Sequence, residues 1–311
     1  MMTLRTLGFL CTVTIQSSMA VLCASIGEVL AEQSGILNLG VEGMMLIGAL
    51  SGFSVASATQ SLWLGVLAAM AAAGVLALIY AAFAITLRAN QVVCGLSLTI
   101  LGTGLSSFLG RPMIGRMGPR FSAWPVPLLC DLPFVGSALF THVPLVYAGF
   151  LLVPAAWFLL FQTRPGLHLR SVGEHPEAAD SAGIPVFRTR YLWTVVGGML
   201  AGLGGAYLSL AYTPGWKENM SSGQGWIAIG MVIFGLWNPW RAAGGALLFG
   251  AINALQFTFE ARQITLIPSY ILRMLPYLFT IGVLVVITRS KRTRALTSAP
   301  AGLGVPFVRE G

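Results

Sequence analysis

The chain has 311 residues, of which 56% are hydrophobic and only 9% are charged, and its mean hydropathy is +0.81. Because a soluble domain carries about 25% charged residues, this composition excludes a water-facing globular surface. The net charge of +8 is spread over short loops, which is typical of a membrane protein and argues against a nucleic-acid partner. The apolar stretches are long and show no alternation with a period of two. The sequence therefore predicts an all-α polytopic membrane protein with eight to ten spans.

Nine spans are expected in chain order, and the seventh is short for a full crossing and is expected to be broken or tilted. They are residues 7–26, 36–56, 62–85, 92–109, 144–161, 191–211, 226–237, 242–257 and 271–287. Residues 1–288 are expected to form one transmembrane domain that includes a polar loop at 163–190. The remainder, 289–311, is expected to be a polar and mobile tail.

Lysine and arginine set the expected orientation, because loops on the cytoplasmic side of a membrane carry an excess of both. When the C-terminal tail is placed in the cytoplasm, eleven of the 18 basic residues fall inside and seven fall outside. The N-terminus then lies outside, and loop 163–190 lies in the cytoplasm. This moderate bias predicts a multi-pass protein with a cytoplasmic C-terminus.

Motifs for catalysis are missing from the sequence. It contains no HExxH zinc motif, no GxSxG nucleophile elbow and no GxxxxGK[ST] phosphate-binding loop. The four cysteines form no CxxC pair, so a metal site is not expected either. We expect a protein that is not an enzyme, binds no cofactor itself and has no ATPase site of its own.

The stretch Gly27–Leu50 carries three carboxylates close to the apolar runs. Glu28 and Glu32 are spaced i,i+4 and so share a helix face, as do Asn38 and Glu42. Ionisable groups within membrane proteins face a cavity or a partner, and the glycines here permit an irregular backbone beside one. Glu28 and Glu32 are expected at the cytoplasmic water interface. For Asn38 and Glu42, a place along a transport path and a bracing contact between helices are equally supported.

Other polar residues near or within spans have the same two interpretations. Asn90 and Gln91 precede the fourth span, and Asn253 and Gln256 lie in the eighth. Each could line a transport path, although for each one alone interhelical hydrogen bonding is the more general role. The candidate path therefore comprises Asn38, Glu42, Asn90, Gln91 and Asn253.

The segment Glu174–Ile184, EHPEAADSAGI, is polar and prone to form a helix between two apolar blocks. Pro176 suits a first helical turn, Glu177 complements the helix dipole, and Gly183 suits a C-terminal stop. About two turns, from Pro176 to Ala182, are expected. A helix this short is unstable alone, so it must dock against something.

Several stretches resemble one transporter family. GEHPEAADSAGI is similar to the EAA loop of ABC-transporter permeases, and Gly27–Ala49 resembles the N-terminal signature of nucleoside and simple-sugar permeases. Ala89–Gly110 and Gly223–Ala251 are similar to further blocks of that family, which lies within the branched-chain amino acid and ribose permease group. The chain departs from the usual pattern at Gln33, Gln91 and Trp226.

The resemblance implies a type II ABC importer-like permease of a bacterial inner membrane, for nucleosides or simple sugars, that works by alternating access. It implies that a coupling helix with Glu174, Pro176, Glu177, Ala178, Ala179 and Gly183 contacts a separate ATPase with two nucleotide-binding domains, where ATP and Mg²⁺ bind. A second homologous permease subunit, a substrate-binding lipoprotein or periplasmic protein, and membrane lipid are the other implied partners. An ion-coupled secondary transporter that works without an ATPase is the alternative.

Overall fold

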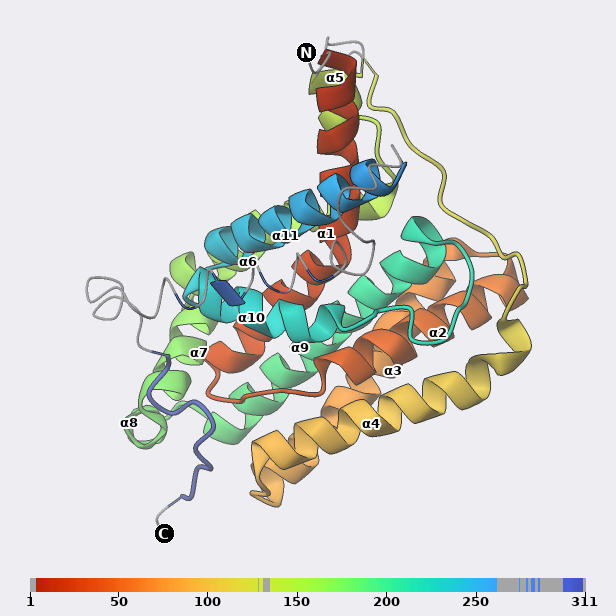
Figure 1. Ribbon diagram of the computed structural model, residues 1–311. Helices are drawn as coiled ribbons and strands as arrows, with labels where there is room; N and C mark the ends of the chain where they lie inside the picture. The colour runs from red at the N-terminus through yellow and green to blue at the C-terminus, as the bar shows by residue number, and fades with distance from the viewer. Residues whose placement is uncertain are drawn as a thin grey trace.

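The fold is a helical bundle, shown by a computed structural model that describes residues 4–127, 129–130, 135–261 and 299–309 and five single positions between 274 and 285. Within these residues, seven helical segments are long and apolar enough to cross a membrane. The helices, with short π and 3-10 turns after some of them, are labelled in Figure 1. They are α1 (Leu4–Gln33), α2 (Val41–Thr59), α3 (Leu62–Ala81), α4 (Gln91–Gly110), α5 (Val135–Leu139), α6 (Pro144–Gln162), α7 (Arg164–Glu174), α8 (Pro176–Ser181), α9 (Val186–Tyr207), α10 (Gln224–Gly235) and α11 (Pro239–Ala261).

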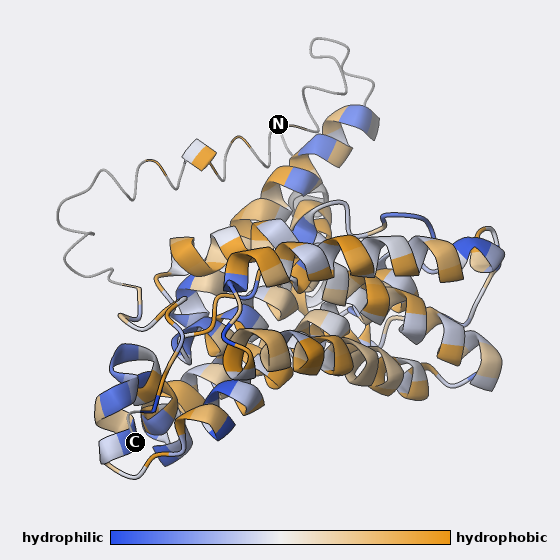
Figure 2. Cartoon of the chain, turned by 90° about the horizontal axis from the view of Figure 1, so that it is seen from below, coloured by the Kyte–Doolittle hydropathy of each residue, from blue (hydrophilic) through white to orange (hydrophobic). Residues whose placement is uncertain are grey.

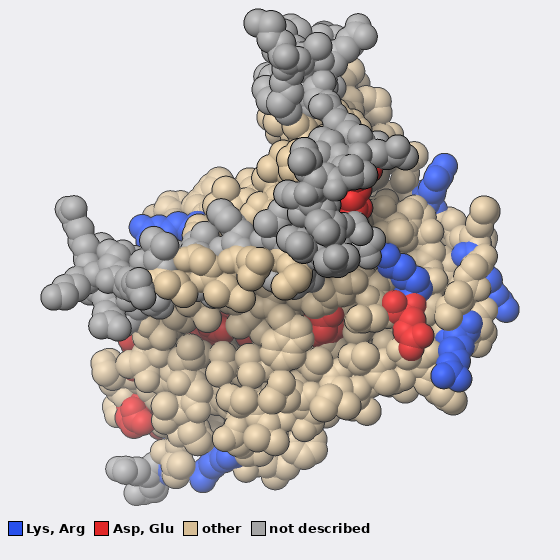
Figure 3. All heavy atoms as spheres, viewed as in Figure 1, with Lys and Arg blue, Asp and Glu red and all other residues tan. Residues whose placement is uncertain are grey.

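Helices α1, α2 and α9 form the centre of the bundle. In α2 and α9, 72% of the most apolar window is buried within the chain, against 28% in α4 and 33% in α6. The long helices are mostly hydrophobic on their outer faces as well, whereas polar segments gather near the C-terminus, beside α7 and α8 (Figure 2). On the face drawn in Figure 3, uncharged side chains dominate, and Lys and Arg gather toward the right-hand end. The outer helices therefore present apolar surface that suits lipid or another membrane subunit.

Small residues bring the central helices close together. A Cβ atom added at Gly102 of α4 would lie 2.6 Å from the Cα atom of Gly43 in α2. One added at Gly48 of α2 would lie 2.6 Å from the Cα atom of Gly202 in α9. Packing of this kind is expected where helices associate in lipid without a hydrophobic driving force.

The expected spans overlap the observed helices, with one corrected start, one short span confirmed and one span mostly outside the described residues. The second span was placed at 36–56, but residues 34–40 are non-helical and α2 begins at Val41, because Gly35 adopts a φ of +88° and ends the preceding helix. The seventh is the 12-residue α10, which confirms that it is too short for a full crossing. The ninth, at 271–287, lies almost wholly outside the described residues. Helix α7, within the expected loop 163–190, was not anticipated.

The close contact between α2 and α4 gives a test of this packing. Gly102→Val should lower the free energy of unfolding by about 1–3 kcal/mol, the usual cost of overpacking a close contact. Gly104→Val is the matched control, since a Cβ atom at Gly104 meets nothing within 4 Å. Thermal unfolding of the purified protein in detergent measures both. Equal melting temperatures for the two variants would contradict the packing described here.

Candidate functional site

A buried break in the backbone lies between α1 and α2. After α1 ends at Gln33, residues 34–40 run without helical structure and almost entirely buried. The backbone N–H of Asn38 donates to Glu28 Oε1 at 3.0 Å, so the segment runs back along the last turns of α1. Glu28 precedes the end of α1 by five residues, which corresponds to about 7.5 Å of helix. Non-helical backbone inside a membrane protein requires partners of this kind.

Asn38 also shapes the end of this segment. Its side-chain Oδ1 accepts a hydrogen bond from the backbone N–H of Gly40 at 2.9 Å, just before α2 begins. Asn38 is fully buried and lies in the non-helical segment, not on a shared helix face with Glu42 as the i,i+4 spacing had suggested. The prediction of an irregular backbone around Gly35 and Gly40 is confirmed.

Glu42 ties α2 to the beginning of α10. Its Oε1 accepts from Ser221 Oγ at 2.5 Å and from the backbone N–H of Gly223 at 2.8 Å. Its Oε2 accepts from the backbone N–H of Gly225 at 2.6 Å. The first N–H groups of a helix have no partner within that helix, and a carboxylate also complements the helix dipole there. Glu42 thus caps a helix that is far away in sequence and begins inside the bundle.

Glu32 fixes the other end of α10. Its Oε2 accepts a hydrogen bond from the indole Nε1 of Trp237 at 2.5 Å, directly after α10 ends. Gln33 Nε2 donates to the backbone carbonyl of Trp237 at 3.4 Å. A helix of 12 residues spans about 18 Å, which is less than the ~30 Å hydrocarbon core. The two carboxylates Glu42 and Glu32 therefore hold both ends of this half-length helix.

The placement of Glu28 and Glu32 corrects the sequence-based expectation. Both were expected at the water interface, yet each is only 1% exposed. The reason is tertiary: residues 34–40 fold back over Glu28, and the turn after α10 covers Glu32. The i,i+4 spacing alone could not distinguish a solvent-exposed helix face from a helix face that other parts of the chain cover.

Gln91 joins the same buried network, whereas Asn90 does not. Gln91, at the start of α4, accepts a hydrogen bond on Oε1 from the backbone N–H of Leu37 at 2.8 Å. Asn90 is exposed, and its Oδ1 accepts from the backbone N–H of Val93 as the N-terminal cap of α4. Tyr80 of α3, which the sequence analysis passed over, donates to the carbonyl of Leu37 at 2.5 Å. Helices α3 and α4 thus both bond the non-helical segment at Leu37.

Asn253 lies apart from this network. It is half-buried on α11, a helix that packs mainly against α1 and α10. Of the five candidate path residues, the structure therefore brings together Asn38 and Gln91 at the break, places Glu42 at the next helix start, and leaves Asn90 and Asn253 elsewhere.

The polar segment singled out in the sequence forms a helical hairpin with α7. Helix α8 begins at Pro176, and Gly183, with a φ of +81°, follows its end, as its start and stop signals predicted. Pro176 and Ala179 are buried, whereas Glu177 and Ala178 are exposed. The short helix thus rests on one face and presents an acidic and a small side chain on the other.

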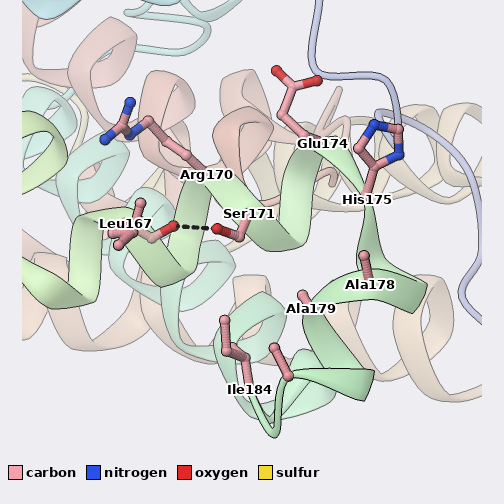
Figure 4. Close-up of a pocket in the computed structure, with 9 residues that line it drawn as sticks. Leu167, Arg170, Ser171, Glu174, His175, Ala178, Ala179 and Ile184 are labelled. Carbon is pink, nitrogen blue, oxygen red and sulfur yellow. Dashed lines mark hydrogen bonds between the residues drawn. The ribbon is translucent and has the colours of Figure 1, made fainter.

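A groove of about 440 Å³ lies between α7 and α8 (Figure 4). Leu167, Ala178 and Ile184 contribute apolar surface to it, and Arg170 and Glu174 are charged residues of its lining. Ser171 Oγ donates to the carbonyl of Leu167 at 2.9 Å and so presents no free hydroxyl group to the groove. Such a groove suits a partner that inserts apolar side chains flanked by charges.

Part of the expected mobile tail is docked against this hairpin. The backbone N–H of Gly302 donates to the carbonyl of Gly173 at 2.8 Å, and Phe307 is only 4% exposed. The expectation of a mobile tail is therefore wrong for residues 299–309, because the backbone N–H groups of Ala301 and Gly302 bond α7 and Phe307 packs in one cluster with residues of α7 and α8. Residues 289–298 lie outside the described part of the chain.

Histidines offer no catalytic cluster in the described part of the chain, where no group of three or more His, Cys, Asp or Glu side chains could hold a metal ion. His168 lies in α7 and His175 caps α8, although loops were expected for both. His142, in the loop before α6, is buried, and its ring Nε2 lies 2.8 Å from the carbonyl of Ala138. Burial lowers the pKa of His142, because it disfavours the charged form of the ring.

Comparison with known proteins identifies the family. Residues 10–288 match the family described as branched-chain amino acid transport system / permease component. The chain belongs to this permease family. The resemblance to nucleoside and simple-sugar ABC permeases is thereby confirmed, and the protein is a membrane permease of the ABC-transporter type.

Three relatives resemble this permease over most of its length. It is 41% identical over 292 residues to the putative glucose ABC transporter permease protein TsgC13 of Haloferax volcanii, covering 87% of this chain and 89% of the relative. It is 34% identical to the guanosine ABC transporter permease protein NupQ of Bacillus subtilis, covering 97% of both chains. The nucleoside ABC transporter permease protein NupC of Lactococcus lactis is 37% identical, with 84% of this chain and 86% of the relative covered.

The cap on α10 gives a stability prediction for the permease. Glu42→Ala should lower the free energy of unfolding by about 1–3 kcal/mol, because it leaves buried N–H groups without an acceptor. Glu42→Gln should cost less, since its carbonyl oxygen still accepts. Glu218→Ala is the control, as Glu218 is an exposed carboxylate in the loop that leads to α10. Thermal unfolding in detergent measures all three, and no difference between Glu42→Ala and the control would contradict the cap.

Proposed function

We propose that this permease is the membrane-spanning subunit of an ATP-driven importer that takes up nucleosides, with simple sugars as the second candidate class, by alternating access. Two relatives that cover most of the chain are named for guanosine and nucleoside transport, which supports the first class. The 41% identical relative named for glucose supports the second. The short, partly exposed helix α8 is the observation that supports coupling to an ATPase.

Helix α8 has the properties of a docking element. It is six residues long, is held on one face by its own chain and exposes Glu177 and Ala178 beside the groove formed with α7. The sequence resemblance gave the coupling role to Glu174, Pro176, Glu177, Ala178, Ala179 and Gly183. In the structure Pro176 and Ala179 face inward, so we assign contact with the ATPase to the exposed Glu174, Glu177 and Ala178, and positioning of the helix to the other three.

The proposed assembly follows from membership of the family. A separate ATPase with two nucleotide-binding domains would bind ATP and Mg²⁺ and contact α8, and a substrate-binding lipoprotein or periplasmic protein would deliver the ligand. A second homologous permease subunit would complete the pathway. Apolar outer faces such as that of α4, where Ile100 and Phe108 are more than 70% exposed, suit lipid or that second subunit.

The proposed orientation places α8 and the C-terminus in the cytoplasm of a bacterial cell, with the permease in the inner membrane. The excess of basic residues in the loops on that side supports it. The contact of residues 299–309 with α7 and α8 supports it further, because both must then lie on one side of the membrane.

We propose that the substrate path runs beside the non-helical segment 34–40, which contains Asn38 and which Gln91 bonds at Leu37. Irregular backbone within a membrane protein is tolerated where it is covered by protein or lines a cavity. Glu42, Asn90 and Asn253 were candidates for the path on sequence grounds. The hydrogen bonds of Glu42 and Asn90 favour bracing and capping for these two, and Asn253 stays a candidate on α11.

A secondary transporter driven by an ion gradient is the alternative. It requires a buried carboxylate that exchanges a proton or sodium ion, and Glu28, Glu32 and Glu42 are all buried. Glu28 and Glu42 accept hydrogen bonds from backbone N–H groups, and Glu32 accepts one from the indole of Trp237, which favours a bracing role. Uptake into vesicles driven by a sodium or proton gradient without the ATPase would establish the alternative and overturn the ATP-driven mechanism.

A bulky residue on the exposed face of α8 tests the coupling role. Ala178→Trp should reduce ATP-driven uptake about tenfold or more, the effect of losing ~1.4 kcal/mol of docking free energy. Ala58→Trp is the matched control, because Ala58 is exposed at the far end of α2. Uptake in proteoliposomes, together with co-purification of the ATPase, measures the effect. Wild-type uptake by Ala178→Trp would contradict the assignment of α8.

Uptake measurements also test the substrate class. Cells that lack their own nucleoside uptake and express the complete transporter should accumulate labelled guanosine and adenosine, and excess unlabelled glucose should not compete. A permease without its ATPase provides the background. Accumulation of glucose without guanosine would overturn the nucleoside assignment while leaving the importer mechanism in place.

A further inference from the structure

Residues 299–309 cross the hairpin formed by α7 and α8 and reach the break between α1 and α2. The backbone N–H of Gly302 donates to Gly173 O at 2.8 Å, and that of Gly304 donates to Gly35 O at 3.1 Å. The N–H of Ala301 donates to Glu174 Oε2 at 3.3 Å. We call residues 299–309 the strap. It passes beside the Glu174–His175 corner in Figure 4.

The strap completes the apolar surface on which α8 rests, called here the seat of α8. Phe307 is 4% exposed and packs in one cluster with Val172 of α7, Ala179 of α8 and Val186 of α9. Its ring centroid lies 5.5 Å from that of Phe187. A helix of six residues cannot persist on its own backbone bonds, so its position depends on this seat.

Charged groups hold the strap along its length. Arg190 of α9 is only 1% exposed, and its Nη1 donates to the backbone carbonyl of Val305 at 3.1 Å. Arg309 Nε lies 3.0 Å from Asp180 Oδ2 on α8. The Arg309 side chain is 70% exposed, so this ion pair adds little to the stability of the fold, but it fixes the direction of the strap. The buried Arg190 is the stronger anchor, because a buried cation needs an acceptor.

The strap therefore links two parts of the molecule that are far apart in sequence. At one end it holds α8, and in its middle it bonds Gly35, from which the buried segment leads to Asn38 and Glu28. We propose that the strap is a positioning element, with Phe307 and Arg190 as its positioning residues, that keeps α8 in a fixed relation to segment 34–40. Displacement of α8 is then carried to the buried network beside the proposed path. This inference rests on the proposed function, in which α8 receives the motion of the ATPase.

Hydrogen exchange on the full-length permease in detergent tests the first half of the proposal. Phe307→Ala should speed exchange of amides 172–184 by about tenfold or more, because it removes the apolar seat of α8. Val308→Ala is the matched control on the same strap, since Val308 is 51% exposed. Phe307→Leu should restore most of the protection.

Gly302→Val is an independent variant for the same measurement. A Cβ atom at this position would lie 2.8 Å from the carbonyl oxygen of Gly173, so the strap must lift there. It should speed exchange of the same amides without removing any side chain from the core. Unchanged exchange in both Phe307→Ala and Gly302→Val would overturn the strap, whatever the transported substrate proves to be.

The ratio of ATP hydrolysed to substrate transported, measured in the assembled transporter, tests the second half. In the Phe307→Ala and Gly302→Val variants, ATP hydrolysis should persist while uptake falls, which raises the ratio about threefold or more. A loss of folded protein would instead lower hydrolysis and uptake together and leave the ratio unchanged. Phe307→Leu should return the ratio toward the wild-type value. Faster exchange with an unchanged ratio would overturn the positioning role.

If wild-type permease neither binds nor stimulates the ATPase, the proposed function fails, and the exchange result still decides whether the strap holds α8.

Discussion

Buried backbone must find partners, and this constraint shapes the centre of the permease. Residues 34–40 are non-helical inside the bundle, and α10 also begins inside the bundle. In a setting without water, the freed N–H groups of such segments cost several kcal/mol each when unpaired. Glu28 and Glu42 supply acceptors for them, and Glu32 binds the indole of Trp237.

The three carboxylates explain how two interrupted segments coexist in one bundle. Glu28 holds the segment that turns back from the end of α1, and Glu42 holds the loop that leads into α10. Both are buried, and both bond backbone N–H groups rather than basic side chains. A carboxylate with fixed partners resists movement, so these residues define a rigid frame around the proposed path.

The strap extends this frame to the surface. Its backbone bonds to Gly35 and Gly173 place one end of the chain between the buried break and the hairpin that carries α8. A coupling element must be exposed enough to contact a partner and fixed enough to transmit its movement. In α8 the exposed Glu177 and Ala178 meet the first need, and the seat that Ala179 shares with Phe307 meets the second.

Sequence reasoning succeeded where the signal is local. The limits of α8, the short seventh span and the irregular backbone at Gly35 follow from proline, glycine and the lengths of apolar runs, because these features depend on neighbouring residues. It missed α7, although Thr163 and Pro165 mark its start, and it missed Tyr80 and Trp237, for which no nearby signal marks a role. Glu28 and Glu32 were misplaced because nothing local says which face the chain will later cover.

By itself the sequence determined that this is a helical membrane protein of a permease family, since low charge, long apolar runs and family blocks are properties of the chain alone. Only the tertiary structure decided which polar residues face each other. The partners of Glu42 lie about 180 residues away, and those of the strap more than 100 away. Hydrogen bonds over such separations depend on how the helices pack, and that packing is set by contacts such as Gly43 on Gly102 that no single stretch of sequence encodes.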